Sequence, residues 1–123
     1  MQAKNPVGYF EIPVTDFERA ILFYEQVFDC KLQRTVIDGN EMALFPFDDR
    51  LPDITGALAK GDSYIPSKQG ARLYFNVSSI DETLQRAEGA GGRLLYPKTS
   101  IGELGWVAEF EDSEGNCIAL HMP

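Results

Sequence analysis

Hydrophobic and polar residues alternate over short segments along most of the chain, and two segments follow a helical period instead. Within residues 7–14, apolar side chains such as Phe10 and Ile12 share one face, which predicts a half-buried strand. Over residues 16–28 the apolar side chains recur at steps of three and four, which predicts an amphipathic helix. A second helix is predicted over residues 80 to about 88, and further strands at residues 31–37, 41–47, 54–59, 72–77, 93–96, 106–111 and 117–121.

The same order of elements occurs twice. A strand, a helix and three strands span about residues 7–60, and the order repeats over about residues 71–121. The last strand of each unit contains an Ala-Leu pair, Ala57-Leu58 and Ala119-Leu120, and the two pairs lie 62 residues apart. We therefore predict an α+β fold of two βαβββ units in a single domain over residues 1–123, with residues 61–70 as the connector.

Both predicted helices begin with a capping signal. Thr15-Asp16-Phe17-Glu18 opens the first helix and Ser79-Ile80-Asp81-Glu82 opens the second, and each motif is typical of a capping box. Ser78 is an alternative cap for the second helix. The helical spacing also predicts four side chains buried against the sheets, namely Tyr24 and Phe28 on the first helix and Leu84 and Ala87 on the second.

The composition is that of an ordinary globular protein, with 44% hydrophobic and 24% charged residues. The net charge of −8 opposes binding to nucleic acid or to an anionic membrane surface, so we expect neither partner. Cys30 and Cys117 lack the spacing of a disulfide framework or a zinc site and are interpreted as passive small hydrophobic residues. Because no apolar run approaches the length of a membrane span and no secretory signal is evident, we expect a cytoplasmic protein.

Two motifs stand in a fixed order along the chain. Asp16-Phe17-Glu18-Arg19-Ala20 is followed by Phe23-Tyr24-Glu25 in the first unit, and Phe110-Glu111-Asp112-Ser113-Glu114-Gly115-Asn116 lies in the second. Together with the duplicated βαβββ unit, they resemble the vicinal oxygen chelate superfamily of glyoxalase I, extradiol dioxygenases and bleomycin resistance proteins. The resemblance covers nearly the whole chain. It implies a curled, partly open mixed sheet around a cavity, on a scaffold that hosts lyases, dioxygenases, epimerases and drug-binding proteins.

The resemblance also implies where a metal would bind. In metal-dependent members the ligands come from the first and last strand of each unit, and these positions fall on Tyr9, Ala57, Arg72 and Ala119. Alanine has no side-chain donor atom, guanidinium is permanently charged and a neutral phenol is a poor ligand, so we expect no metal and no other cofactor. A shift of two residues would bring only Glu11 or His121 to the site, which is too few ligands.

Charged residues within apolar strands are candidates for ligand contact. Arg72 lies in such a strand, and a buried arginine is costly unless paired. It therefore either pairs with Glu11 or Glu109 or binds an anionic ligand. Glu11 and Glu109 are candidates for a general base, with a solvated strand face as the alternative.

Aromatic residues and the only histidine complete the candidate set. Tyr9, Tyr74 and Phe45 either line the cavity or pack in the core. His121 is either a partly exposed residue near the C-terminus or a pocket base or hydrogen-bond donor. The candidate ligand-binding residues are Tyr9, Glu11, Phe45, Arg72, Tyr74, Glu109 and His121.

Three functions are compatible with these patterns. The leading interpretation is a glyoxalase/bleomycin-resistance-like protein that binds a small molecule without a metal, and Arg72 favours a ligand with an anionic oxygen. The alternatives are a metal-dependent lyase or dioxygenase of the same superfamily and a protein-interaction module. The resemblance further implies a homodimer, because members of the superfamily often pair units across chains.

Overall fold

The computed structural model describes residues 5–48 and 54–123, which form two helices, two four-stranded mixed sheets and a short 3-10 turn at Gly102–Leu104. The helices are α1 (Phe17–Phe28) and α2 (Ile80–Gly89). The strands are β1 (Tyr9–Pro13), β2 (Gln33–Ile37), β3 (Asn40–Leu44), β4 (Thr55–Lys60), β5 (Tyr74–Asn76), β6 (Arg93–Ser100), β7 (Trp106–Glu111) and β8 (Cys117–Met122).

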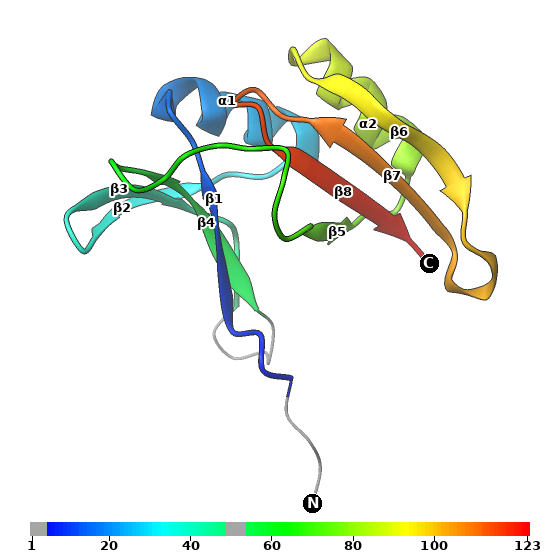
Figure 1. Cartoon of the computed structure of the whole chain (residues 1–123), viewed down its shortest axis with the longest axis horizontal. Helices are drawn as coiled ribbons and strands as arrows, with labels where there is room; N and C mark the ends of the chain where they lie inside the picture. Colours follow the sequence, from blue (N-terminus) through cyan, green and yellow to red (C-terminus); the bar gives the residue numbers. More distant parts are fainter. Residues whose placement is uncertain (1–4, 49–53) are drawn as a thin grey trace, which may run out of the picture.

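The two sheets have the same topology. Their strand orders are β1-β4-β3-β2 and β5-β8-β7-β6. β1 is parallel to its neighbour β4, and β5 is parallel to its neighbour β8. The other neighbouring strands are antiparallel. In Figure 1, α1 and α2 lie next to each other on one side of the sheets, and the two sheets extend away from the helices in different directions. The predicted α+β fold of two βαβββ units is confirmed.

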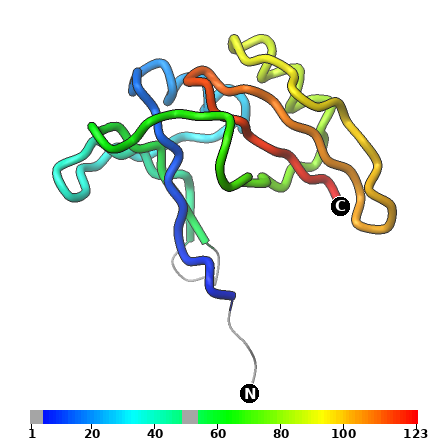
Figure 2. Tube along the Cα trace, in the orientation of Figure 1, coloured from blue at the N-terminus to red at the C-terminus, as the bar shows by residue number. Residues whose placement is uncertain are grey.

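The connector, residues 61–73, crosses from β4 in the first sheet to β5 in the second, as Figure 2 shows in green. The predicted strand over residues 72–77 is shorter in the structure, because β5 begins only at Tyr74. The chain already runs beside β8 before that point, since the Ala119 N–H donates to the Leu73 carbonyl at 3.0 Å. Arg72 therefore lies at the end of the connector.

The core lies between the helices and the sheets and is shared by both units. Tyr24 and Ala87 are fully buried as predicted, whereas Phe28 and Leu84 are only partly buried and pack against the core. Phe28 lies where the two units meet, and its ring stacks on Phe75 of the second sheet with centroids 4.4 Å apart. Its position at this seam explains its partial exposure. Neither helix in the described part of the chain is long and apolar enough to cross a membrane.

The observed N-cap residue is the predicted one at α2 and a different one at α1. Ser79 caps α2 and accepts a hydrogen bond from the Glu82 N–H at 3.1 Å. At α1 the cap is Asp16, which accepts from the Arg19 N–H, so the prediction of a Thr15 cap is wrong. The reason is a competing acceptor, because Thr15 donates its N–H and its hydroxyl to Glu114 at 2.9 and 3.1 Å.

Glu114 joins the turn between β7 and β8 to the start of α1. Its side chain is fully buried and accepts from the Asp16 N–H at 2.8 Å and from Arg19 Nε at 2.8 Å. Burial alone would raise the pKa of this carboxyl, but the hydrogen bonds from Arg19, Asp16, Ser113 and Thr15 outweigh it and lower the pKa to about 2. The carboxylate thus links the second unit to the first.

Two more residues of the same turn make buried contacts with the first unit. The Tyr24 hydroxyl donates to Asp112 Oδ2 at 2.5 Å, and Asn116 Nδ2 donates to the Pro13 carbonyl at 2.8 Å. Asp112 and Asn116 are almost fully buried, so these bonds are shielded from water. The two sequence motifs that were recognised far apart in the chain therefore bond directly to each other.

Some strand boundaries differ from the predicted ones. β6 continues to Ser100, past the predicted end at Tyr96, and includes Pro97. Proline is tolerated there because β6 is the edge of its sheet and its pairing with β7 is already irregular. The hairpin between β2 and β3 turns at Asp38 and Gly39, which both have positive φ, as the Asp-Gly pair predicts.

Candidate functional site

The candidate site lies on the inner face, which we define as the face of the two sheets opposite α1 and α2. On β1, Ile12 points into the core, so its neighbours Tyr9 and Glu11 lie on the inner face. On β8, Ile118 and Leu120 point into the core, so Cys117 and Ala119 lie on the inner face. These positions agree with the predicted alternation.

A cavity of about 260 Å³ opens where β1, the connector and the start of β8 meet. Glu11 contributes to one wall, and Arg72 and Cys117 contribute to another. Pro13, Ile65 and Ala71 add apolar surface, and Ser67, Gln69 and Asn116 add polar atoms. The connector is fastened over this cavity, because the Ser67 N–H donates to Asn116 Oδ1 at 3.0 Å.

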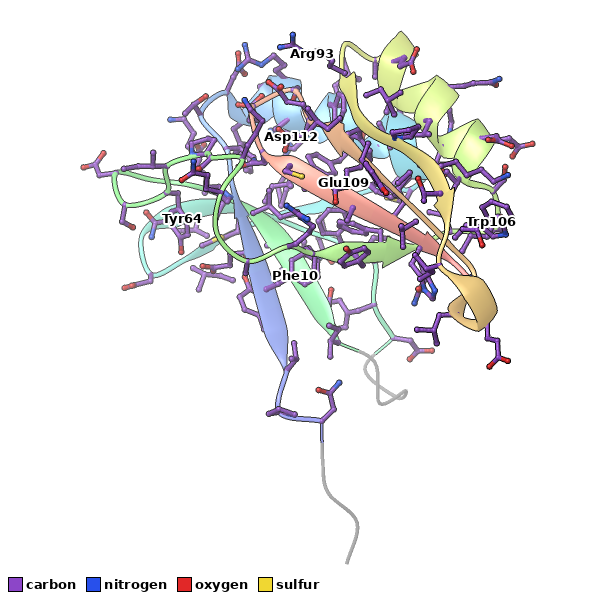
Figure 3. All side chains as sticks on the ribbon, turned by 45° about the vertical axis from the view of Figure 1, so that its right-hand side comes forward. Phe10, Tyr64, Arg93, Trp106, Glu109 and Asp112 are labelled. Atoms are coloured by element: carbon purple, nitrogen blue, oxygen red, sulfur yellow. The ribbon has the colours of Figure 1, made fainter. Side chains whose placement is uncertain are left out.

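Arg72 pairs with Glu109, which is one of the two outcomes predicted for this arginine. Its Nη1 atom lies 3.1 Å from Glu109 Oε2, and the arginine side chain is 49% exposed while that of Glu109 is 17% exposed. The Cys117 thiol donates to Glu109 Oε1 at 3.6 Å. Burial, and then the charge of Glu109, raise the pKa of Cys117, so the thiol stays protonated near neutral pH. In the view of Figure 3, Glu109 lies between Tyr64 and Trp106.

Glu11 accepts hydrogen bonds from two phenols. The Tyr9 hydroxyl donates to Oε2 at 3.1 Å, and the Tyr64 hydroxyl donates to Oε1 at 2.6 Å. Burial and then the bond to Glu11 raise the pKa of Tyr9 to about 12, and the bond to Glu11 also raises the pKa of Tyr64. Both hydroxyls therefore keep their protons and act as donors at neutral pH.

Tyr64 comes from the connector and covers part of the inner face of the first sheet. It packs against a small cluster formed by Met42, Ala57 and Ala59, which are all buried. The connector therefore brings the Tyr64 hydroxyl to Glu11 across these buried side chains.

The four positions at which the resemblance implies metal ligands do not fit a divalent cation. Ala57 and Ala119 are fully buried and have no donor atom. Arg72 is held by Glu109, and Tyr9 donates its proton to Glu11. Within residues 5–48 and 54–123, no three His, Cys, Asp or Glu side chains gather as a metal site would require.

Of the predicted site residues, Glu11 and Arg72 line the same cavity, and the others lie in separate places. Tyr74 follows Arg72 on the inner face of the second sheet and is 48% exposed. Phe45 lies in the core, where its ring centroid is 5.8 Å from that of Tyr24. His121 lies at the end of β8, where Nε2 donates to the Leu104 carbonyl at 2.7 Å and Nδ1 lies 3.1 Å from Asn76 Oδ1. The structure therefore groups Tyr9 with Glu11, and Arg72 with Tyr74 and Glu109.

Several residues of the site are absent from the predicted set, and Tyr64 and Cys117 make the most specific contacts among them. Tyr64 lies in the irregular connector, where no hydrophobic period indicates the direction of a side chain. Cys117 was interpreted as passive, yet it lines the cavity and contacts Glu109. Its alternation with Ala119 and His121 was the available signal that it faces the cavity.

Comparisons with known proteins agree with this architecture. Residues 7–120 match the family model of the Glyoxalase/Bleomycin resistance protein/Dioxygenase superfamily. A glyoxylase-like domain-containing protein of Didymella fabae is 36% identical over 125 residues, which cover 98% of this chain and 95% of that protein.

Solved structures share the fold at lower identity. An antibiotic binding protein from Streptomyces is 22% identical, with a TM-score of 0.67 over 100% of this chain and 99% of that one. A glyoxalase I mutant from Zea mays is 18% identical, with a TM-score of 0.71 over 95% of this chain, which spans only 46% of the maize protein. The match to the family model and the relative of similar length show that this chain belongs to the glyoxalase/bleomycin resistance protein/dioxygenase superfamily.

Proposed function

We propose that this protein binds a small organic molecule with an anionic oxygen in the inner-face cavity, and that it does so without the family metal. The observation that carries the proposal is the position of Arg72, whose half-exposed guanidinium lines the cavity. A fixed guanidinium supplies the positive charge that a metal would otherwise bring to the ligand.

The ion pair with Glu109 occupies only part of the hydrogen-bonding capacity of Arg72. A guanidinium carries five N–H donors, and the ion pair with Glu109 is made through Nη1. The guanidinium also interacts with the side chains of Tyr74 and Cys117. Because the group is half-exposed, it keeps donors that can reach a ligand. Glu109 holds the guanidinium in place, which lowers the entropy cost of binding an anion.

The cavity walls suit a ligand with an apolar body. Ile65, Pro13 and Ala71 line the cavity beside the charged residues. Ligand sites commonly combine a mostly apolar wall with a few polar groups that fix orientation. The structural similarity to an antibiotic binding protein from Streptomyces supports a binding role on this fold.

A titration of 3-phenylpropanoate tests the proposal. The protein is treated with EDTA and the dissociation constant is measured by NMR chemical-shift titration for the wild type and Arg72→Met. We expect the substitution to weaken binding by about 1.5 to 3 kcal/mol, roughly tenfold or more. Because Arg72→Met leaves Glu109 without its partner, the double variant Arg72→Met/Glu109→Gln is measured beside it.

Arg93→Met is the matched control. Arg93 pairs with Glu111 on the same sheet but is not among the residues that line the cavity. Equal affinities of the wild type, Arg72→Met and the double variant would contradict the proposal. One tightly bound Zn, Ni, Mn or Fe per purified chain would favour a metal-dependent lyase or dioxygenase instead.

A further inference from the structure

We propose that the ligand is a zwitterion of amino-acid size, whose anionic group contacts Arg72 and whose cationic group contacts Glu11. The anionic half of this inference rests on the proposed function, and the cationic half rests on Glu11 alone. Both residues line the same cavity, Glu11 from β1 and Arg72 from the end of the connector.

Glu11 is prepared to accept a donor from a ligand. Its carboxylate is exposed and takes one hydrogen bond on each oxygen, from Tyr9 and Tyr64. A carboxylate has about four lone-pair positions, so each oxygen retains capacity for another donor. The two phenols fix its orientation, and Tyr64 reaches it from the connector that forms part of the cavity wall.

Glu11 has no cationic partner in the described part of the chain. The ion pairs among residues 5–48 and 54–123 do not include it, and Arg72 pairs with Glu109 instead. A glutamate of the cavity wall without a cation is open to a cationic ligand group. Glu109, in contrast, is already paired with Arg72 and mostly buried.

A simple anion would contact favourably only one of the two charged residues of this cavity, Arg72. It would gain the contact with Arg72, but the negative charge of Glu11 on the same small cavity would repel it. An ammonium group on the same ligand removes this repulsion and adds a charge-assisted hydrogen bond. The cavity of about 260 Å³ lies just below the usual range for ligand sites, which suits a ligand of about the size of an amino acid.

Three probes of similar shape separate the two contacts. L-phenylalanine carries both charges, 3-phenylpropanoate lacks the ammonium group and 2-phenylethylamine lacks the carboxylate. Dissociation constants for all three are measured with the metal-free wild-type protein by NMR chemical-shift titration. We expect phenylalanine to bind about tenfold more tightly than either of the other two.

Glu11→Gln then tests the assignment of the cationic contact. The glutamine keeps an acceptor for the phenols but loses the charge, so the advantage of phenylalanine over 3-phenylpropanoate should fall to about twofold or less. Glu41→Gln, an exposed change on β3, is the matched control and should keep that advantage. If Glu11→Gln fails to fold, the comparison of the three probes on the wild type still tests whether both charged groups of the ligand contribute to binding.

The outcomes distinguish this inference from the proposed function. If 3-phenylpropanoate binds through Arg72 as tightly as phenylalanine does, the zwitterion is wrong and the anion-binding function stands. If 2-phenylethylamine binds and neither carboxylate probe responds to Arg72→Met, both are wrong. Binding of none of the three probes would also overturn both.

Discussion

The guanidinium of Arg72 and the carboxylate of Glu109 form an ion pair that joins the end of the connector to β7, with Nη1 and Oε2 3.1 Å apart. The carboxylate is mostly buried, while the guanidinium remains half-exposed at the cavity. Glu109 therefore has two opposing effects on an anionic ligand. It orients Arg72, and its negative charge competes with the ligand for the same guanidinium.

The competition should dominate, so Glu109→Gln is expected to strengthen anion binding. Glutamine still accepts a hydrogen bond from Arg72, while the repulsion of the ligand is removed. We expect a gain of about 1 kcal/mol, roughly fivefold in the dissociation constant of 3-phenylpropanoate. Glu111→Gln on the same strand is the control, since Glu111 pairs with Lys68 and Arg93. Weaker binding by Glu109→Gln would show that orientation matters more than charge.

Glu114→Gln should destabilise the fold in a way that depends on pH. The folded pKa of Glu114 is about 2, below its ordinary value of 4.5. Its stabilising effect is therefore complete above the ordinary pKa and is lost as the pH falls toward 2.

We expect Glu114→Gln to cost about 2 kcal/mol at neutral pH, allowing for the partial exposure of Arg19, and the difference from wild type to narrow below about pH 4. Urea unfolding at several pH values measures both effects. The exposed Glu103→Gln serves as the reference change. A penalty that is independent of pH between 3 and 7 would exclude the charge of Glu114 as its cause.

Tyr24→Phe should weaken the contact between the two units. The substitution removes the hydroxyl that donates to Asp112 Oδ2 and leaves a buried carboxylate with one donor fewer. We expect a loss of about 1 to 2 kcal/mol in the free energy of unfolding. Tyr96→Phe, at an exposed tyrosine of β6, should change it little. Equal stability of the two variants would mean that the Asp112 bond contributes nothing to folding.

A homodimer remains a prediction. β2 and β6 are edge strands of their sheets, and they expose Val36 and Leu94. A second copy of the chain would cover such edges and faces. Sedimentation equilibrium at micromolar concentration should give twice the mass of 13.7 kDa, and a single-chain mass throughout would refute the dimer.

The fold followed from sequence because its signals are local. Hydrophobic period, an Asp-Gly turn and a helix-opening motif act over a few residues, and the duplication repeated the hydrophobic periods and the helix-opening motif. The error at Thr15 has a different origin, since its competing acceptor, Glu114, is 99 residues away along the chain. No local rule can weigh that contact against a capping bond.

The site was less predictable for two physical reasons. Residues Met42, Ala43, Leu44 and Phe45 are all apolar, so alternation does not show which of them face the cavity, and Phe45 proved to lie in the core. The direction of Tyr64 depends on how the irregular connector crosses the sheet. By contrast, Glu109 is one of the two carboxylates that the sequence offers Arg72 as partners, although the structure places Arg72 half-exposed at the end of the connector and not within a strand.

The central claim is that Arg72 in the inner-face cavity replaces the family metal as the contact for an anionic ligand. Native mass spectrometry of the protein with 3-phenylpropanoate and one equivalent each of Zn²⁺, Mn²⁺, Ni²⁺ and Fe²⁺ tests it most directly, because one spectrum reports both kinds of binding. We predict a species that carries the anion and no metal, and its loss in Arg72→Met. A species with one metal ion per chain, or an anion bound only together with a metal, would contradict the claim.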